Sequence, residues 1–175
     1  MPLQEPTREF LSFLQNNPGI RSRIAAAPDR TLLYAGSFFR PIWQELESIR
    51  LSNAQVASKK LLPDILASIS TPGRAYPTLL AWAKALDRQE PWKENGFVVW
   101  RALSGIFAAN AAGRVSFVIG SRIDRSDKVF AATELPVLLR NHKVDPITRD
   151  MLAFYQRCLH RGKHAVDIDV GFIGG

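Results

Sequence analysis

The sequence has few of the residues that build disulfides, thiolate metal centres or membrane spans. Its 175 residues contain one cysteine, Cys158, which cannot form an intramolecular disulfide or hold zinc alone, because thiolate sites need several ligands. No uninterrupted apolar run reaches about 18 residues, so a membrane-spanning helix is not expected. The N-terminal stretch contains two Glu and no long apolar segment, unlike the usual signal peptide. We therefore expect a cytoplasmic protein, or one delivered without a cleaved signal peptide.

Negative charge is also scarce, and positive charge is unevenly placed. The chain has 23 Lys and Arg against 16 Asp and Glu, a formal net charge of +7. Arg supplies 16 of these cations, which favours bidentate contacts with phosphate or carboxylate. Residues 96–163 hold 11 cations and only 5 carboxylates, so most of the positive field belongs to the second half. This balance predicts an anionic partner, either nucleic acid or an acidic protein.

The apolar pattern changes along the chain. Residues 1–95 show mainly helical spacing punctuated by Pro and Gly, although residues 31–37 predict either a short strand or an extended segment that leads into a helix. Apolar runs at 97–103 and 115–119, separated by a turn, predict an antiparallel hairpin. Strict alternation within 165–173 predicts a further strand with one buried face.

We therefore predict an α+β fold in a single domain, residues 1–175. A helical part, 1–95, is followed by a small, mainly antiparallel sheet with flanking helices, built from residues 97–131 and 165–173. Residues 128–131 predict a short strand in that sheet, and residues 134–140 a helix. Asp145 and Pro146 predict the start of a longer helix, with Asp as its cap and Pro in its first turn. Apolar residues then recur at helical spacing, namely Ile147, Met151, Phe154, Tyr155 and Cys158.

All three histidines lie in the C-terminal part of the chain, among many Arg and Lys. A pair of histidines among cations is the equipment of a metal-independent ribonuclease, in which one acts as base, one as acid, and the cations hold the scissile phosphate. His160 and His164 are the candidates for this proton transfer. No cofactor is predicted. No metal site is predicted either, because Asp167 and Asp169 share a strand face without a third acidic residue nearby.

Arg101, Ser116 and Glu134 occur in an order that resembles the active site of the ADP-ribosyltransferase superfamily. The resemblance implies that Arg101, in the middle of a strand, holds the phosphate of NAD and that Glu134 polarises the ribose. The spacings, 15 and 18 residues, are tighter than that fold normally has. An NAD-consuming transferase with Arg101 and Glu134 as catalytic residues is therefore one alternative.

The leading hypothesis is a basic module that engages nucleic acid, in its most specific form a small metal-independent nuclease of effector or toxin type. A second alternative is a non-catalytic protein–protein interaction module with an acidic partner, in which the tryptophans build the core or a partner groove. The candidates for phosphate contact are cations of the second half, namely Arg114, Arg122, Arg125, Lys128, Arg157, Arg161 and Lys163.

Overall fold

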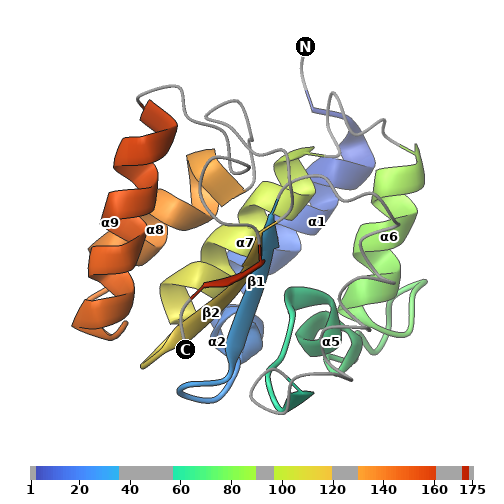
Figure 1. Cartoon of the computed structure of the whole chain (residues 1–175). Helices are drawn as coiled ribbons and strands as arrows, with labels where there is room; N and C mark the ends of the chain where they lie inside the picture. Colours follow the sequence, from blue (N-terminus) through green and yellow to red (C-terminus); the bar gives the residue numbers. More distant parts are fainter. Residues whose placement is uncertain (1–2, 36–56, 90–96, 120–129, 161–170, 174–175) are drawn as a thin grey trace.

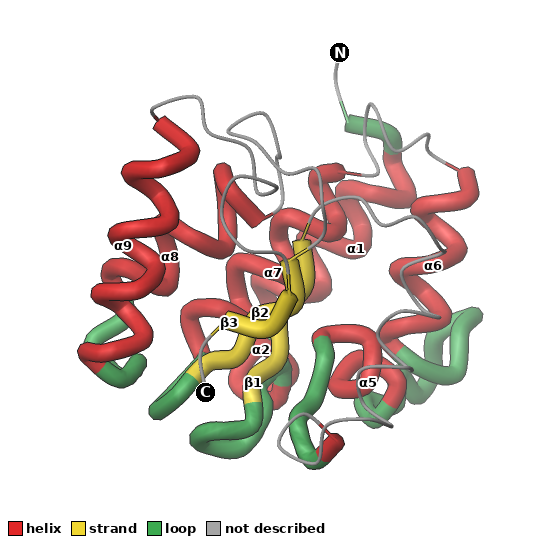
Figure 2. Tube along the Cα trace, in the orientation of Figure 1, coloured by secondary structure: helices red, strands yellow, loops and turns green. Residues whose placement is uncertain are grey.

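The computed structural model of the chain describes residues 3–35, 57–89, 97–119, 130–160 and 171–173. Within these ranges, helices lie behind and on both sides of a small sheet (Figures 1 and 2). In chain order the elements are α1 (Glu5–Asn16), α2 (Pro18–Arg23), β1 (Thr31–Ala35), α5 (Leu62–Ala67), α6 (Leu79–Gln89), α7 (Phe97–Asn110), β2 (Val115–Ile119), the π-helical turn η2 (Phe130–Glu134), α8 (Leu135–Arg140), α9 (Pro146–His160) and β3 (Gly171–Ile173). None of the described helices combines the length and apolarity needed to cross a membrane.

The sheet combines residues from both parts of the chain. β1 pairs in parallel with β2, from Thr31 opposite Val115 to Ala35 opposite Ile119. β3 lies on the other side of β2 and pairs with it in antiparallel orientation over a short stretch. The described residues are mostly helical and the main strand pairing is parallel, so the predicted α+β fold class with its mainly antiparallel sheet is wrong. The predicted separation of a helical part, 1–95, from a sheet-forming part is wrong as well, because β1 belongs to the first part.

The strand predicted at residues 97–103 is the first half of the central helix α7. Val99, Leu103 and Phe107 lie on one side of this helix and are fully buried. α7 contacts α1, α5, α6 and α8, so it is apolar on most sides and lacks the polar face from which a helical period is read. The predicted hairpin between residues 97–103 and 115–119 is therefore wrong, and a helix precedes β2 instead.

Other predicted elements have mixed outcomes. The strand at residues 128–131 is wrong where it is described, because Phe130 begins the π-helical turn η2. β2 and α8 are confirmed at the positions predicted for them. Asp145 caps α9 as predicted, since its Oδ1 accepts a hydrogen bond from the amide of Ile147 at 3.0 Å. Most of the alternating run 165–173 lies outside the described residues, and its last three residues form β3.

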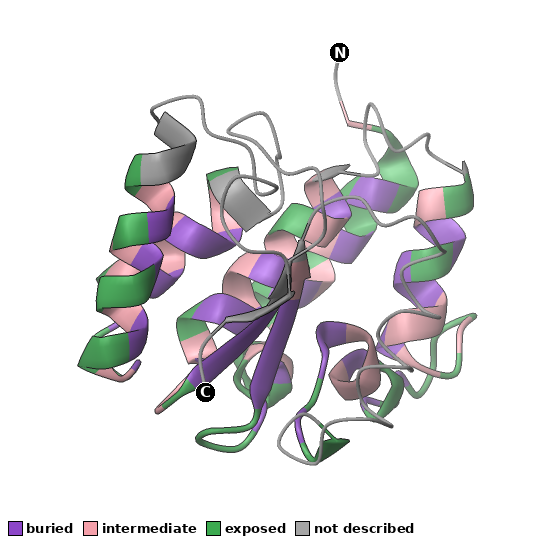
Figure 3. Cartoon of the chain, viewed as in Figure 1, coloured by how far each residue is buried: buried purple, intermediate pink, exposed green. Residues whose placement is uncertain are grey.

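An aromatic cluster joins α1 to α6 in the interior. The ring of Phe10 meets that of Trp82 edge to face, with 5.0 Å between the ring centroids. The guanidinium of Arg74 lies 5.0 Å from the ring centroid of Phe13 and 5.4 Å from that of Trp82. Trp100 packs against the same core. The two described tryptophans therefore serve the core, and Figure 3 shows the buried residues of these helices facing inward.

A buried asparagine fixes the end of α7. Asn141 Nδ2 donates hydrogen bonds to the carbonyls of Ala108, Ala109 and Ala111 at 2.8–3.2 Å. Its Oδ1 accepts a hydrogen bond from the amide of Lys143 at 3.0 Å. One side chain thus satisfies carbonyls that the helix leaves unpaired at its end, and it ties the connection between α8 and α9 to α7.

Candidate functional site

The predicted catalytic residues that the structure describes lie on elements that approach one end of the molecule. Arg101 lies in the first half of α7, Glu134 ends η2, and His160 is the last residue of α9. The beginning of α7 and the end of α9 both lie toward the carboxyl end of β1, at the top of Figure 1. His164 lies outside the described residues. Within the described ranges, no group of three or more His, Cys, Asp or Glu is placed to hold a metal ion.

Arg101 and Glu134 are connected through a threonine. Arg101 Nε donates a hydrogen bond at 3.2 Å to Oγ1 of Thr133, which directly precedes Glu134. α7 and η2 are in contact, and a Cβ placed on Gly105 would lie at ordinary contact distance, 3.6 Å, from Thr133 Cγ2. Glu134 is only 4% exposed, whereas Arg101 is exposed. Arg101 lies on a helix and not in the middle of a strand, which removes the strand arrangement on which the resemblance to ADP-ribosyltransferases depends.

Tyr34 is a further polar residue of this region, and the sequence pattern does not mark it. It lies next to the last residue of β1. Burial, and after it the nearby negative charge of Glu134, raises the pKa of Tyr34 to about 12. In the sequence, a tyrosine near the end of an apolar run indicates only a strand residue. Its electrostatic link to Glu134 follows from the fold.

The raised pKa of Tyr34 predicts a specific loss of stability at alkaline pH. The pKa of Tyr34 in the folded state lies above the ordinary 10.0, so the neutral tyrosine contributes to the stability of the fold. This contribution is fully present below pH 10 and is lost as the pH rises toward 12. We expect the wild-type free energy of unfolding to fall by about 2–3 kcal/mol more than that of Tyr34→Phe over this interval. Urea denaturation of both proteins at several pH values measures the difference. Parallel curves for the two proteins between pH 10 and 12 would contradict the assignment.

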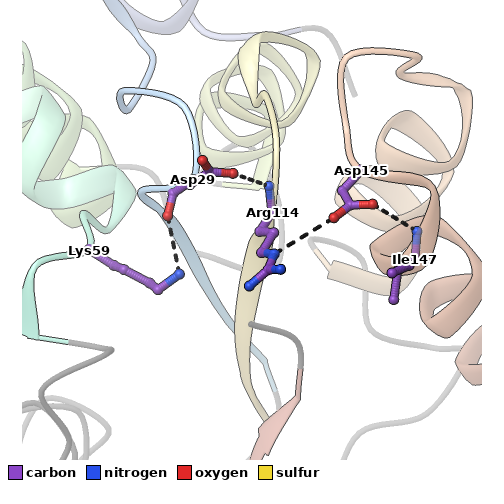
Figure 4. Close-up of polar contacts among 5 residues, drawn as sticks. All are labelled: Asp29, Lys59, Arg114, Asp145 and Ile147. Carbon is purple, nitrogen blue, oxygen red and sulfur yellow. Dashed lines mark hydrogen bonds and ion pairs between the residues drawn. The ribbon is translucent and has the colours of Figure 1, made fainter.

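A second polar cluster lies at the opposite end of the sheet, where β1 and β2 begin (Figure 4). Asp29 Oδ1 accepts a hydrogen bond from the amide of Arg114 at 2.7 Å, and the Asp29 carbonyl accepts one from Lys59 Nζ at 3.1 Å. Arg114 Nε lies 3.8 Å from Asp145 Oδ2. Burial lowers the pKa of Lys59, and the charge of Asp29 opposes that change. The cluster holds together the starts of β1, β2 and α9, which is a role in the fold.

Two of the predicted phosphate contacts are described, and they lie far apart. Arg114 is at the start of β2, beside the cap of α9, whereas Arg157 is in the last part of α9. Helical rise separates the two ends of α9 by about 20 Å. The described part of the chain therefore does not unite these two cations on one surface. The remaining candidates, Arg122, Arg125, Lys128, Arg161 and Lys163, lie outside the described residues.

The outer face of α9 carries a stripe of exposed apolar side chains. Ile147, Met151 and Phe154 are 67%, 37% and 57% exposed, and among the described residues they are the large apolar side chains that stand out into solvent. Their spacing of four and three residues places them on one side of the helix. We call these three residues the α9 stripe. The sequence pattern grouped them with Tyr155, which is instead buried.

The α9 stripe directly adjoins the buried side of the helix. At 100° per residue, Met151 neighbours Tyr155, which packs inward together with Leu152. On its other border lie Asp150 and Arg157, both exposed. The apolar arc of α9 is therefore wider than the part that the core covers, and Figure 3 shows the outer side of the helix as exposed.

The described residues of α8, α9 and the loop between them are more cationic than anionic. The Arg157 guanidinium lies 6.0 Å from the ring centroid of Phe154. The described carboxylates here are Asp150 on α9 and Asp145, which precedes α9 and is already engaged as its cap and with Arg114. The described cations of α8, α9 and the loop between them are Arg140, Lys143, Arg149 and Arg157.

Comparison with known proteins gives no guide to function. No protein-family model, no curated protein and no solved structure matches this chain.

Proposed function

We propose that the chain is a protein-interaction module whose α9 stripe binds an acidic amphipathic helix. The observation that carries this proposal is the exposure of Ile147, Met151 and Phe154 on one side of a single helix. Contiguous exposed apolar side chains bordered by polar ones are typical of protein-binding surfaces. Such a surface fits a partner protein with its own apolar side chains. It fits the phosphate backbone of a nucleic acid less well, because that backbone is charged and carries no apolar side chains.

The spacing of the stripe favours a helical partner. α9 has 15 residues and is about 22 Å long, and its apolar side chains occupy positions i, i+4 and i+7. A second helix that lies along α9 presents apolar residues at matching intervals, as in other pairs of packed helices. Burial of each exposed side chain contributes about 1–2 kcal/mol, because each already loses part of its surface to the fold.

The charge around the stripe favours an acidic partner. The protein has a net charge of +7, and cations outnumber carboxylates on α8, α9 and the loop between them. Arg157 borders the stripe and lies over Phe154, so a partner carboxylate that reaches Arg157 comes close to the apolar contact. Opposite charges at the rim of an interface speed association and exclude wrong partners.

The test uses synthetic helical peptides of about 15 residues with leucines at i, i+4 and i+7. One peptide carries Glu beside the leucines, a second carries Lys, and a short labelled RNA is the third probe. We expect the acidic peptide to bind at least about tenfold more tightly than the basic one, with an affinity that falls as salt rises. Binding of the RNA alone, unaffected by Phe154→Ala, would overturn the proposal and favour the nucleic-acid hypothesis.

Two variants locate the binding on α9. Phe154→Ala should weaken binding of the acidic peptide by about tenfold, because an aromatic side chain buried in an interface contributes about 1.4 kcal/mol or more. Arg157→Glu should weaken binding of the acidic peptide more than Phe154→Ala does. Arg88→Glu on α6 is the control, since it changes the net charge equally at an exposed position on another helix. Equal losses from Arg157→Glu and Arg88→Glu would show a nonspecific effect of net charge and contradict the proposed site.

A further inference from the structure

We infer that the guanidinium of Arg101 is the receptor for a phosphate group at the carboxyl end of the parallel strands. Arg101 is exposed, and within the described part of the chain no carboxylate lies within ion-pair distance of it. Its Nε donates a hydrogen bond to Thr133 Oγ1. An arginine that is oriented by a neutral side chain keeps its full charge available for an anion.

The hydrogen bond to Thr133 selects the edge of the guanidinium that faces a ligand. Nε is occupied, so the edge formed by Nη1 and Nη2 is the one left to bind. These two nitrogens match two oxygens of a phosphate in a bidentate pair, which is stronger and more directional than a single contact. Thr133 is thus a positioning residue for Arg101, and its methyl group faces Gly105 of α7.

The location of Arg101 in the fold gives an independent argument. Parallel strands in sheets covered by helices bind their ligands beyond the carboxyl ends of the strands. Tyr34 lies at that end of β1 and is electrostatically linked to Glu134, the residue after Thr133. Thr133 and Glu134 belong to a π-helical turn, a distortion of helix geometry that recurs at functional sites. Within this region Glu134 is buried, Tyr34 is partly buried, and Arg101 is exposed.

The proposal is tested by titrating pyrophosphate into the protein and its variants by calorimetry. Arg101→Gln should weaken binding by at least about tenfold, because it removes the charge and one edge of donors. Arg88→Gln is a matched control: Arg88 is also exposed on a helix and also donates from Nε, at 3.3 Å to the carbonyl of Lys84. It should bind as the wild type does. Equal effects of the two substitutions, or no binding by the wild type, would overturn the proposal.

A second variant tests the positioning role, and a second probe identifies the source of the phosphate. Thr133→Val keeps the methyl contact but removes the acceptor, so it should weaken binding by about threefold while the charge of Arg101 stays. Binding of pyrophosphate but not of a short RNA assigns the site to a small phosphate ester, and stronger RNA binding that also needs Arg101 assigns it to nucleic acid. Phe154→Ala should leave both unchanged, so the outcome is independent of the α9 stripe.

Discussion

Replacement of Phe107 by alanine is expected to lower the free energy of unfolding by about 3–5 kcal/mol. Phe107 is fully buried on α7, the helix that contacts α1, α5, α6 and α8, so the cavity left by its ring has walls in several elements. Such walls cannot all move inward together, which makes the cost of the cavity large. Urea denaturation followed by circular dichroism should show a lower midpoint with an unchanged slope.

Phe154→Ala is the control for this experiment because it removes the same atoms from an exposed site. Phe154 is on the outer side of α9, and its loss should change the free energy of unfolding by less than about 0.5 kcal/mol. The same variant is expected to weaken binding of the acidic peptide. Equal destabilisation by the two substitutions would contradict the described burial, and it would also remove the α9 stripe as a surface feature.

The helix that carries Phe107, α7, also illustrates why the predicted fold class is wrong. Residues 97–103 combine valines with aromatic side chains, which is the composition of a strand, and the polar face expected of a surface helix is missing. A helix packed on most sides has no such face to show. The alanines and the leucine that favour a helix lie mainly after residue 101. The sequence pattern assigns this part of the chain to the end of a strand and to a turn.

The strand partner of β2 could not be deduced from local pattern either. Thr31 of β1 lies 84 residues before Val115, its partner on β2, and the pairing is parallel. A local hairpin is the expectation when two apolar runs are close in sequence, whereas a parallel pair needs a long connection that local pattern cannot show. The sequence therefore indicated β2 correctly and assigned it the wrong neighbour.

The predicted site residues Arg101 and Glu134 stay a prediction, and the structure changes their setting. Arg101 lies on a helix and donates a hydrogen bond to Thr133, the residue before Glu134 in a π-helical turn. Tyr34 carries no motif, and its raised pKa depends on burial that only the fold creates. For α9 the helical period was correct, yet a period cannot tell which part of a wide apolar arc other elements will cover.

Replacement of Gly113 by alanine is expected to lower the free energy of unfolding by about 3 kcal/mol. The backbone at Gly113 has φ +70°, where an L side chain costs about 1–2 kcal/mol. A Cβ there would also overlap Asp29 Oδ1 and lie 2.9 Å from Asp29 Cγ. Asp29 would have to move, and the amide of Arg114 would lose the acceptor that it now has at 2.7 Å, a further cost of about 1–2 kcal/mol.

Gly73 separates these two contributions because it shares the backbone conformation without the crowding. Its φ is +77°, and a Cβ placed there meets no heavy atom within 4 Å. Gly73→Ala should therefore show the conformational cost alone, about 1–2 kcal/mol by urea denaturation. Equal destabilisation at the two glycines would show that the Asp29 side chain yields without cost, and the tie between the starts of β1 and β2 would then be weaker than its geometry indicates.

The substitution Asp29→Gly tests whether the Asp29 carboxylate causes the extra cost of Gly113→Ala. Asp29 itself has φ 65°, so glycine suits its backbone while removing the carboxylate that Gly113→Ala would displace. In this background Gly113→Ala should cost about as little as Gly73→Ala, because the hydrogen bond to Arg114 is already absent. The double-mutant cycle should then give a coupling of about 1–2 kcal/mol between the two positions. Additive effects would place the cost of Gly113→Ala in the backbone alone.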